Sequence, residues 1–378
     1  METYKLSDLC EILDAKRKPL SALQRAKKQG IYPYYGAQGI IDHLDEYLLD
    51  GEYLLVAEDG ANLETRNQPI ANIAKGKIWV NNHAHVLGSN GKCPLNLLGF
   101  ILNNMNISPY VTGCAQPKLN QENLRNIEIE LPSHIDRIAS ILSSLDRKIE
   151  LNNKINADLE EMAQAIFKNW FVDFEPFKDG KFVDSELGMI PEGWKVGTLE
   201  DIAEITMGQS PAGNSLNENR EGMIFYQGSS DFGFRFPSIR VFTTDPKRLA
   251  VANSVLFSVR APVGDINVAK EECCIGRGVA SIKSKYGHDS YLFYAMKSLH
   301  KLFDSFDGEG TVFGSINKKT LSAIQILLPS DGIVEQFNDI ASSFDDRIRS
   351  LSDENSRLSL LRDTLLPRLM SGELEVPE

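Results

Sequence analysis

The chain has 378 residues, of which 42% are apolar, and its formal net charge at pH 7 is −12. This length predicts two domains, and the composition is that of an ordinary globular protein, which excludes the disordered and fibrous classes. No run approaches the ~18 consecutive apolar residues that a membrane helix needs. Met1 opens directly into amphipathic sequence, so we expect a cytoplasmic protein without a signal peptide.

The cysteines and the charge distribution narrow the function classes further. No CxxC spacing indicates a zinc site, so we expect no metal and interpret the thiols as reduced. They are Cys10, Cys93, Cys114, Cys273 and Cys274. Half of the net charge lies in residues 331–378, and the globular parts are nearly neutral. Any nucleic-acid surface must therefore be a clustered face on the globular parts.

An internal repeat organises the whole chain. Two stretches match, "GCAQPKLNQENLRNIEIELPS" ending at Ser133 and "GTVFGSINKKTLSAIQILLPS" ending at Ser330, and each is followed by a segment with heptad spacing. The offset is far longer than the period of a solenoid repeat. The chain is therefore predicted to be a tandem of two modules, each a globular domain followed by a long helix.

In chain order, residues 1–133 form the first globular domain. Short apolar runs alternate with turn signals, as in "GEYLLVAEDGAN" and "GKIWVNN", which predicts strands of a mixed α/β domain. Residues 134–177 follow as the first long helix, and residues 178–193 as a linker. Residues 194–330 form the second domain, and residues 331–378 the second helix and tail. The predicted fold class is α+β, with two mixed α/β domains separated by two long helices.

Both helices carry apolar residues spaced alternately four and three apart, with one Asn at the equivalent place, which is typical of a coiled-coil seam. The positions predicted for helix pairing and partner binding are Leu145, Ile149, Asn156, Leu159, Ile166, Trp170, Phe171, Phe344, Ile348, Asn355, Leu358 and Leu365. We expect Asn156 and Asn355 to face each other, or nearly so, across the seam. The alternative is that each helix only packs on its own domain.

The connection between the helices favours antiparallel pairing. A helix over residues 134–170 is about 55 Å long at ~1.5 Å per residue. A parallel pair would need the linker after it to run back along that length almost fully stretched. An antiparallel pair needs no such stretch and would place the domains at opposite ends of a rod.

Candidate DNA contacts lie in loops that combine basic, amide and aromatic side chains with glycine, because arginine and lysine suit guanine and phosphate and amides suit adenine. They are Lys16, Arg17, Lys18, Tyr34, Tyr35 and Gln38 in the first domain, and Gln209, Gln227, Ser229, Ser230 and Arg235 in the second. Core packing is the alternative for the tyrosines.

Three further patterns carry a functional and a structural interpretation. His83 and His85 alternate on one strand, and base contacts or buried hydrogen bonds fit them better than a zinc pair without a third ligand. Arg260 and Arg277 follow strand ends, as DNA contacts or as salt-bridged scaffold residues. The loop "VAEDGAN" carries Glu58 and Asp59, which could accept from cytosine amino groups or cap a turn.

The whole chain resembles a known family, the specificity (S) subunits of type I restriction–modification systems. The resemblance lies in "YPYYGAQGIIDHLDEYLLDGEYLLVAEDGANL", in "CCIGRGVASI" and in "LDRKIELNNKINADLEEMAQAIFKNWFVDFEPF". It implies a role in DNA recognition and antiviral defence, with one half of a split target read by each domain and the helices holding two methyltransferase (M) subunits. It also implies that the M subunits bind S-adenosylmethionine and methylate adenine at N6, and that restriction (R) subunits use ATP and Mg.

The residues themselves indicate no catalysis and no cofactor in this chain. No GxxxxGK[ST] phosphate loop is present, and "DFEPF" lacks the spacing of an adenine-methyltransferase motif. We interpret that segment as the aromatic end of the first helix. Two alternatives remain open, a coiled-coil scaffold whose end domains bind protein or carbohydrate, and a fused methyltransferase or nuclease.

Overall fold

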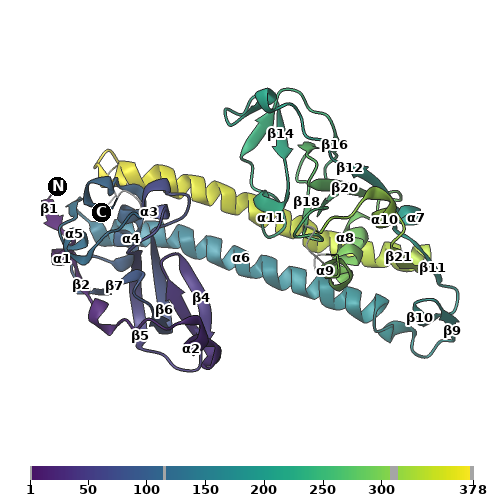
Figure 1. The fold of residues 1–378 in the computed structure, drawn as a ribbon, viewed down its shortest axis with the longest axis horizontal. Helices are drawn as coiled ribbons and strands as arrows, with labels where there is room; N and C mark the ends of the chain where they lie inside the picture. The colour runs from purple at the N-terminus through teal and green to yellow at the C-terminus, as the bar shows by residue number, and fades with distance from the viewer. Residues whose placement is uncertain (1, 114–115, 307–313, 375–378) are drawn as a thin grey trace. The chain divides into compact units, whose positions relative to one another are not determined.

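The computed structural model describes residues 2–113, 116–306 and 314–374, which form two compact units. Unit 1 contains the residues up to Asn152 and those from Asp353 onward, and unit 2 contains Asn153–Ser352. Each unit therefore combines one globular domain with one half of each long helix (Figure 1). Cys114 and Gly310, the latter part of the repeated stretch, lie outside the described residues.

The strands of unit 1 form a six-stranded sheet in the order β2-β7-β5-β6-β3-β4 and a separate antiparallel pair, β1 with β8. The strands are β1 (Glu2–Lys5), β2 (Cys10–Ile12), β3 (Gln29–Gly36), β4 (Gly39–Leu44), β5 (Leu49–Ala57), β6 (Ala71–Val80), β7 (Ala84–Ser89) and β8 (Glu128–Leu131). The pairing of β3 with β6 is parallel, and the other pairings of the sheet are antiparallel.

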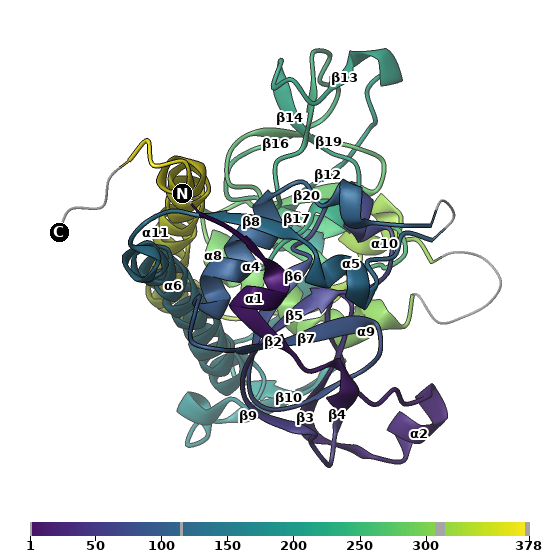
Figure 2. The ribbon, with the colours of Figure 1, turned by 90° about the vertical axis from the view of Figure 1, so that its left-hand side faces the viewer.

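Short helices connect these strands. They are α1 (Leu6–Leu9), η1 (Asp14–Lys16), α2 (Ala22–Ala26), α3 (Asn62–Thr65), α4 (Leu95–Asn104), η2 (Ser108–Tyr110) and α5 (Gln121–Arg125). The apolar helix α4 packs on β5, β6 and β7 and also contacts the first long helix, α6 (Ile135–Phe171), where Asn96 donates to the carbonyl oxygen of Ala139. Helices α1 and α5 lie side by side at the same end of unit 1 (Figure 2).

Unit 2 keeps part of this topology, but its shorter strands are divided between two sheets. Its four-stranded sheet has the order β12-β20-β17-β18, its five-stranded sheet the order β13-β15-β14-β19-β16, and β11 pairs with β21. The strands are β9 (Phe182–Ser185), β10 (Gly188–Pro191), β11 (Lys195–Thr198), β12 (Ala203–Met207), β13 (Leu216–Asn217), β14 (Met223–Tyr226), β15 (Val241–Thr243), β16 (Leu249–Ala250), β17 (Val255–Ser258), β18 (Ile266–Val268), β19 (Cys273–Ile275), β20 (Val279–Ser284) and β21 (Gln325–Leu328).

The helices of unit 2 complete the correspondence. They are η3 (Glu175–Phe177), α7 (Leu199–Ile202), η4 (Gly213–Ser215), η5 (Ser229–Asp231), α8 (Asp289–Ser298), α9 (His300–Asp304), α10 (Lys318–Ser322) and the second long helix, α11 (Asp331–Met370). The repeated Asn caps α5 and α10 alike, because Asn120 accepts from the N–H of Asn123 and Asn317 from that of Thr320. Strands β2, β7 and β5 correspond to β12, β20 and β17, and the parallel pair β3–β6 corresponds to β14–β19.

The two long helices pack against each other antiparallel in each unit. In unit 1, Asp146 binds Arg362 at 2.7 Å, and six residues further along α6 Asn152 donates to Asn355, seven residues earlier on α11, at 2.9 Å. In unit 2, the rings of Phe167 and Phe171 on α6 contact Phe337 near the start of α11. Antiparallel pairing is therefore confirmed, and so is the α+β fold class.

Each helix pair is also part of a domain core. In unit 1, Ile138, Leu142 and Leu366 lie in one buried cluster with residues of α4 and β5. In unit 2, Phe171 and Phe174 contact the ring of Trp194, so the aromatic end of α6 packs on the start of the second domain. Each domain is thus attached to both helices through apolar surface.

Two amides of α6, Asn152 and Asn156, are buried in the seam, and the Oδ1 of each has no hydrogen-bond partner among the described residues. The Nδ2 of Asn152 donates to Glu354 and Asn355, both at 2.9 Å. Asn355 therefore contacts the α6 amide one seam position before Asn156, the predicted partner. A buried amide in such a seam specifies register at a cost in stability.

Replacing both Asn152 and Asn355 with Leu should raise the stability of unit 1, because an unpaired buried oxygen costs about 1–3 kcal/mol. Register should loosen at the same time, and oligomers should form. Thermal denaturation and sedimentation measure the two effects. Leu360→Gln, at a position that is 70% exposed, is the control and should change neither. A less stable, strictly monomeric double variant would contradict this role for the amides.

Candidate nucleic-acid interface

Three loops meet at one end of each domain and are held by the same backbone hydrogen bonds. We call them the loop end, residues 58–60, 81–83 and 117–119 in unit 1 and residues 259–261, 276–278 and 314–316 in unit 2. In unit 1, the bonds run from Glu58 N to His83 O (2.9 Å), Asn81 N to Tyr35 O (3.0 Å), Gly60 N to Pro117 O (3.1 Å) and Leu119 N to Glu58 O (2.8 Å).

In unit 2, the corresponding bonds run from Val259 N to Gly278 O (3.0 Å), Gly276 N to Tyr226 O (2.8 Å), Ala261 N to Gly314 O (3.1 Å) and Ile316 N to Val259 O (3.0 Å). Glu58 thus corresponds to Val259, Asp59 to Arg260, Asn82 to Arg277 and His83 to Gly278. The two loop ends share a backbone and differ in side chains. Sequence reasoning missed this correspondence, although the repeat reaches the loop end at Lys118 and Ser315.

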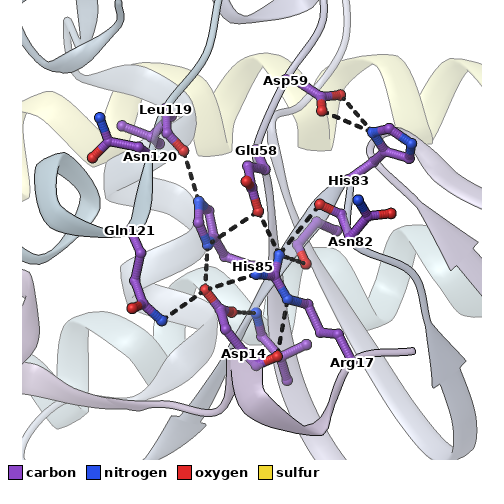
Figure 3. A network of polar contacts seen from close by, with 12 residues as sticks. Asp14, Arg17, Glu58, Asp59, Asn82, His83, His85, Leu119, Asn120 and Gln121 are labelled. Carbon is purple, nitrogen blue, oxygen red and sulfur yellow. Dashed lines mark hydrogen bonds and ion pairs between the residues drawn. The ribbon is translucent and has the colours of Figure 1, made fainter. Parts of the chain in front are cut away.

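The loop end of unit 1 is supported by a buried His–Asp pair (Figure 3). His85 is fully buried on β7, where Nδ1 lies 2.6 Å from Asp14 Oδ2 and Nε2 lies 2.7 Å from Leu119 O. Gln121 also donates to Asp14, at 3.0 Å. The structure corrects the prediction of a DNA contact for His85 in favour of the buried hydrogen bonds that were its alternative.

Arg17 connects the first loop to the second, and Lys118 connects the first to the third. The Nη1 of Arg17 lies 2.5 Å from Glu58 Oε2 and also donates to the carbonyl oxygen of Ala84 at 3.0 Å (Figure 3). Lys118 binds the other oxygen of Glu58 at 3.2 Å. With 15% of its side chain exposed, Arg17 holds the loop end together, and this placement argues against the predicted base contact.

The charges of this network shift two carboxyl pKa values. Burial alone would raise the pKa of Asp14, but its hydrogen bond with His85, the charges of His85 and Arg17 and the N–H of Val86 lower it below its ordinary value. Burial likewise opposes ionisation of Glu58, and its bonds to Arg17 and Lys118, with the charge of His85, lower its pKa. Both groups favour the folded state when ionised.

One pair at the loop end of unit 1 faces solvent. His83 is half exposed, and its Nδ1 lies 2.8 Å and 3.0 Å from the two carboxylate oxygens of Asp59. Lys16, Lys18 and Gln38 are exposed, and Tyr35 is half-buried. Tyr34 is buried and its hydroxyl accepts from the N–H of Leu20, so the predicted DNA contact is corrected to core packing.

The loop end of unit 2 gathers several predicted residues. Ser210 donates to Gln227 Oε1 at 3.0 Å and accepts from the N–H of Arg277 at 3.3 Å. The loops pack closely, because a Cβ at Gly276 would lie 2.6 Å from Gln227 Oε1. Exposed side chains of this group are those of Gln209, Gln227, Ser230, Arg260 and Arg277, and Ser229 is half-buried.

Arg235 lies apart from this group. Only 3% of its side chain is exposed, and the guanidinium lies 3.0 Å from Glu160 of α6 and 2.5 Å from Asp345 of α11. It also donates to the hydroxyl of Tyr294 at 2.9 Å and stacks on Phe293. The structure therefore corrects the predicted DNA contact, because Arg235 attaches the second domain to both helices.

The described residues also bear on metal binding, thiol reactivity and membrane insertion. They contain no group of three His, Cys, Asp or Glu side chains arranged for a metal ion. Cys10, Cys93, Cys273 and Cys274 are buried free thiols, and burial raises the pKa of Cys93 to about 12. Within the described ranges, no helix has both the length and the hydropathy for a bilayer crossing.

Comparison with known proteins decides the family. The model of the type I restriction modification DNA specificity domain matches residues 1–161 and 191–359. The chain belongs to this family of specificity (S) subunits. A Methanocaldococcus jannaschii protein named "Putative type I restriction enzyme MjaX specificity subunit" is 35% identical over 281 residues, which cover 72% of this chain and 65% of that protein.

Other matches agree in family and fold. The type I restriction enzyme HindI specificity subunit of Haemophilus influenzae is 27% identical over 335 residues, covering 68% of this chain and 71% of its own. The matches thus span about two thirds of the length of these relatives. The crystal structure of the type I S subunit from M. genitalium has the same fold, with a TM-score of 0.58 at 15% identity over 100% of this chain and 96% of its own.

Acid should unfold unit 1 through its loop-end network. Because the pKa values of Asp14 and Glu58 are lowered on folding, their contribution to stability is complete above the ordinary carboxyl pKa of about 4. It is lost as the pH falls through the lowered values. Denaturant titrations between pH 7 and pH 3 should show a shallower loss for Asp14→Asn combined with Glu58→Gln. An equally steep loss in that variant would assign acid sensitivity to other groups.

Removing the Arg235 side chain should destabilise unit 2 strongly. Arg235→Ala leaves Glu160 and Asp345 without their shared partner, which typically costs about 3–5 kcal/mol in a buried cluster. The matched control is Arg240→Ala, because Arg240 binds Asp231 at 2.9 Å but is 62% exposed. The control should lose about 1 kcal/mol or less. Equal losses of unfolding free energy in the two variants would contradict the role of Arg235 in attaching the second domain to both helices.

Proposed function

We propose that this chain is the DNA-specificity subunit of a type I restriction–modification complex and that each globular domain reads one half of a bipartite target. Residues 1–133 would read the first half-site and residues 194–330 the second. The observation that carries the proposal is the pair of loop ends, which share a backbone and present different side chains. One scaffold used twice with different chemistry suits a target with two unlike halves.

The exposed side chains suit contact with duplex DNA. In the first loop end, Asn82 and His83 are exposed, with Lys16 and Lys18 on the adjoining segment. In the second, Gln227, Arg260 and Arg277 are exposed. Amides and arginines pair with adenine and guanine edges, whereas lysines contact phosphate at any sequence. The near-neutral domains then need a basic partner for tight binding.

We propose that the paired helices hold two M subunits. In unit 1 they expose large apolar side chains, Leu151 on α6 and Leu360 and Leu361 on α11. In unit 2, α6 exposes Met162. We infer that the M subunits cover these side chains. The M subunits would supply S-adenosylmethionine and adenine methylation, and R subunits would supply ATP-driven cleavage with Mg. This chain itself would be non-catalytic.

Methylome mapping tests the proposal. A host that expresses this chain with its M partner should carry methylated adenines in a bipartite motif with a fixed gap. Groove-reading modules on one face of DNA favour half-sites about 34–36 Å apart. Deleting one heptad from each helix (residues 149–155 and 348–354) should shorten the gap and leave both half-sites unchanged.

Two controls separate the alternatives. The chain without M subunit should transfer no label from tritiated S-adenosylmethionine to DNA. A methylated motif without a gap, or half-sites whose bases change with the heptad deletion, would contradict the division of labour between the domains. Labelling by the chain alone would contradict the non-catalytic role.

A further inference from the structure

We propose that His83, held by Asp59, is a base-reading residue of the first domain, and that Arg260 reads a base from the equivalent place in the second. The inference rests on the proposed function and goes beyond it, because it assigns one base position in each half-site to a named side chain. Three observations carry it: the fixed orientation of His83, the hydrogen bonding that this leaves open, and the backbone correspondence of Asp59 with Arg260.

Contacts from two loops fix His83. Its N–H donates to Asn81 Oδ1 at 2.8 Å, and its carbonyl oxygen accepts from Glu58 at 2.9 Å. The ring is then oriented by the carboxylate of Asp59, which lies 2.8 Å from Nδ1. Figure 3 shows this pair at the edge of the network, apart from the buried His85. A side chain held in this way loses little conformational entropy when it binds.

The orientation determines which bases His83 accepts. In the neutral ring, the carboxylate of Asp59 takes the hydrogen bond from Nδ1–H, which leaves Nε2 as an acceptor. Half of the His83 side chain is exposed. An acceptor in the major groove pairs with the amino group of adenine N6 or cytosine N4, whereas guanine O6 and thymine O4 offer no donor. His83 should therefore require adenine or cytosine at one position.

The second domain presents the opposite hydrogen-bonding character at this place. Arg260 corresponds to Asp59, since Ala261 and Gly60 make equivalent backbone bonds to Gly314 and Pro117. The side chain of Arg260 is exposed and has no hydrogen-bond or ion-pair partner among the described residues. A guanidinium donates two parallel bonds to guanine O6 and N7.

The second domain has no side chain at the position equivalent to His83. Gly278 occupies it, and a Cβ there would lie 2.6 Å from the carbonyl oxygen of Gln227. A histidine cannot be accommodated at that point without moving the loop. The second domain therefore has Arg260 without a neighbouring histidine, where the first has the Asp59–His83 pair. This exchange predicts an adenine or cytosine in one half-site and a guanine at the corresponding place in the other.

The test uses the complete complex of this chain with its M partner and duplex DNA. The variants are His83→Ala, Asp59→Asn, Asp59→Leu and Arg260→Ala, each assayed by methylome mapping and by competition binding with single-base variants of each half-site. Lys92→Ala and Lys319→Ala, exposed changes outside the loop ends, are the controls. Melting temperatures of the variant complexes check that each one folds.

His83→Ala should relax one position of the first half-site by roughly 5- to 150-fold and leave the second half-site unchanged. Asp59→Leu should do the same, whereas Asp59→Asn, whose Oδ1 still accepts from Nδ1–H, should retain the preference. That rescue separates a positioning role for Asp59 from a merely structural one. Arg260→Ala should relax only a guanine of the second half-site.

The outcomes distinguish this inference from the function on which it rests. If folded His83→Ala and Arg260→Ala complexes keep every base preference of the wild type, the residue assignment is overturned and the bipartite function stands. If the wild-type complex itself shows no bipartite motif, the proposed function is contradicted, and the residue assignment with it. Relaxation in both half-sites from a single variant would also overturn the assignment, because each residue should act on its own half-site.

Discussion

The packing of α6 against α11 is the constraint on which the rest of the molecule depends. Each unit is completed by half of each helix, so neither domain core is closed by its own residues alone. In unit 1 the closure is apolar, through Ile138, Leu142 and Leu366. In unit 2 the apolar contact is joined by a buried charge cluster around Arg235. The cluster also includes Lys297, which pairs with Glu160. A domain attached to both helices cannot change its orientation without breaking core contacts.

Buried charged groups hold the backbone of the unit 1 loop end in place. The exposed side chains on that backbone can therefore differ between the two domains. The loop end of unit 1 is fixed on its buried side by hydrogen bonds of Asp14, His85 and Glu58, for which water does not compete. Above them, His83 and Asp59 contribute little to the core and can change at small cost in stability. The second domain keeps the backbone bonds without these buried groups. The exposed side chains can thereby differ between the two domains while the shared backbone of the loop ends is kept.

The tandem organisation, the long helices and their antiparallel direction were predictable, because they follow from repeats, seven-residue spacing and the length of a linker. Family resemblance added the function class. The burial of Arg235, Tyr34 and His85 was not predictable. Arg235 is buried by Glu160 and Asp345, which are 75 and 110 residues away in the sequence. A local pattern of glycine and basic residues is the same for a free arginine and a buried one, and only tertiary contacts separate them. Which α6 amide contacts Asn355 was left open for a similar reason, since spacing alone does not fix register.

The central claim is that each loop end recognises the bases of one half-site and that the two loop ends can be exchanged on the same backbone scaffold. The most direct measurement is the methylome of a chain in which residues 194–330 also replace residues 1–133, expressed with the M partner. The account predicts a gapped motif in which both halves carry the bases of the wild-type second half-site. A motif that keeps the wild-type first half-site would contradict it, because the bases read there would then be set outside residues 1–133.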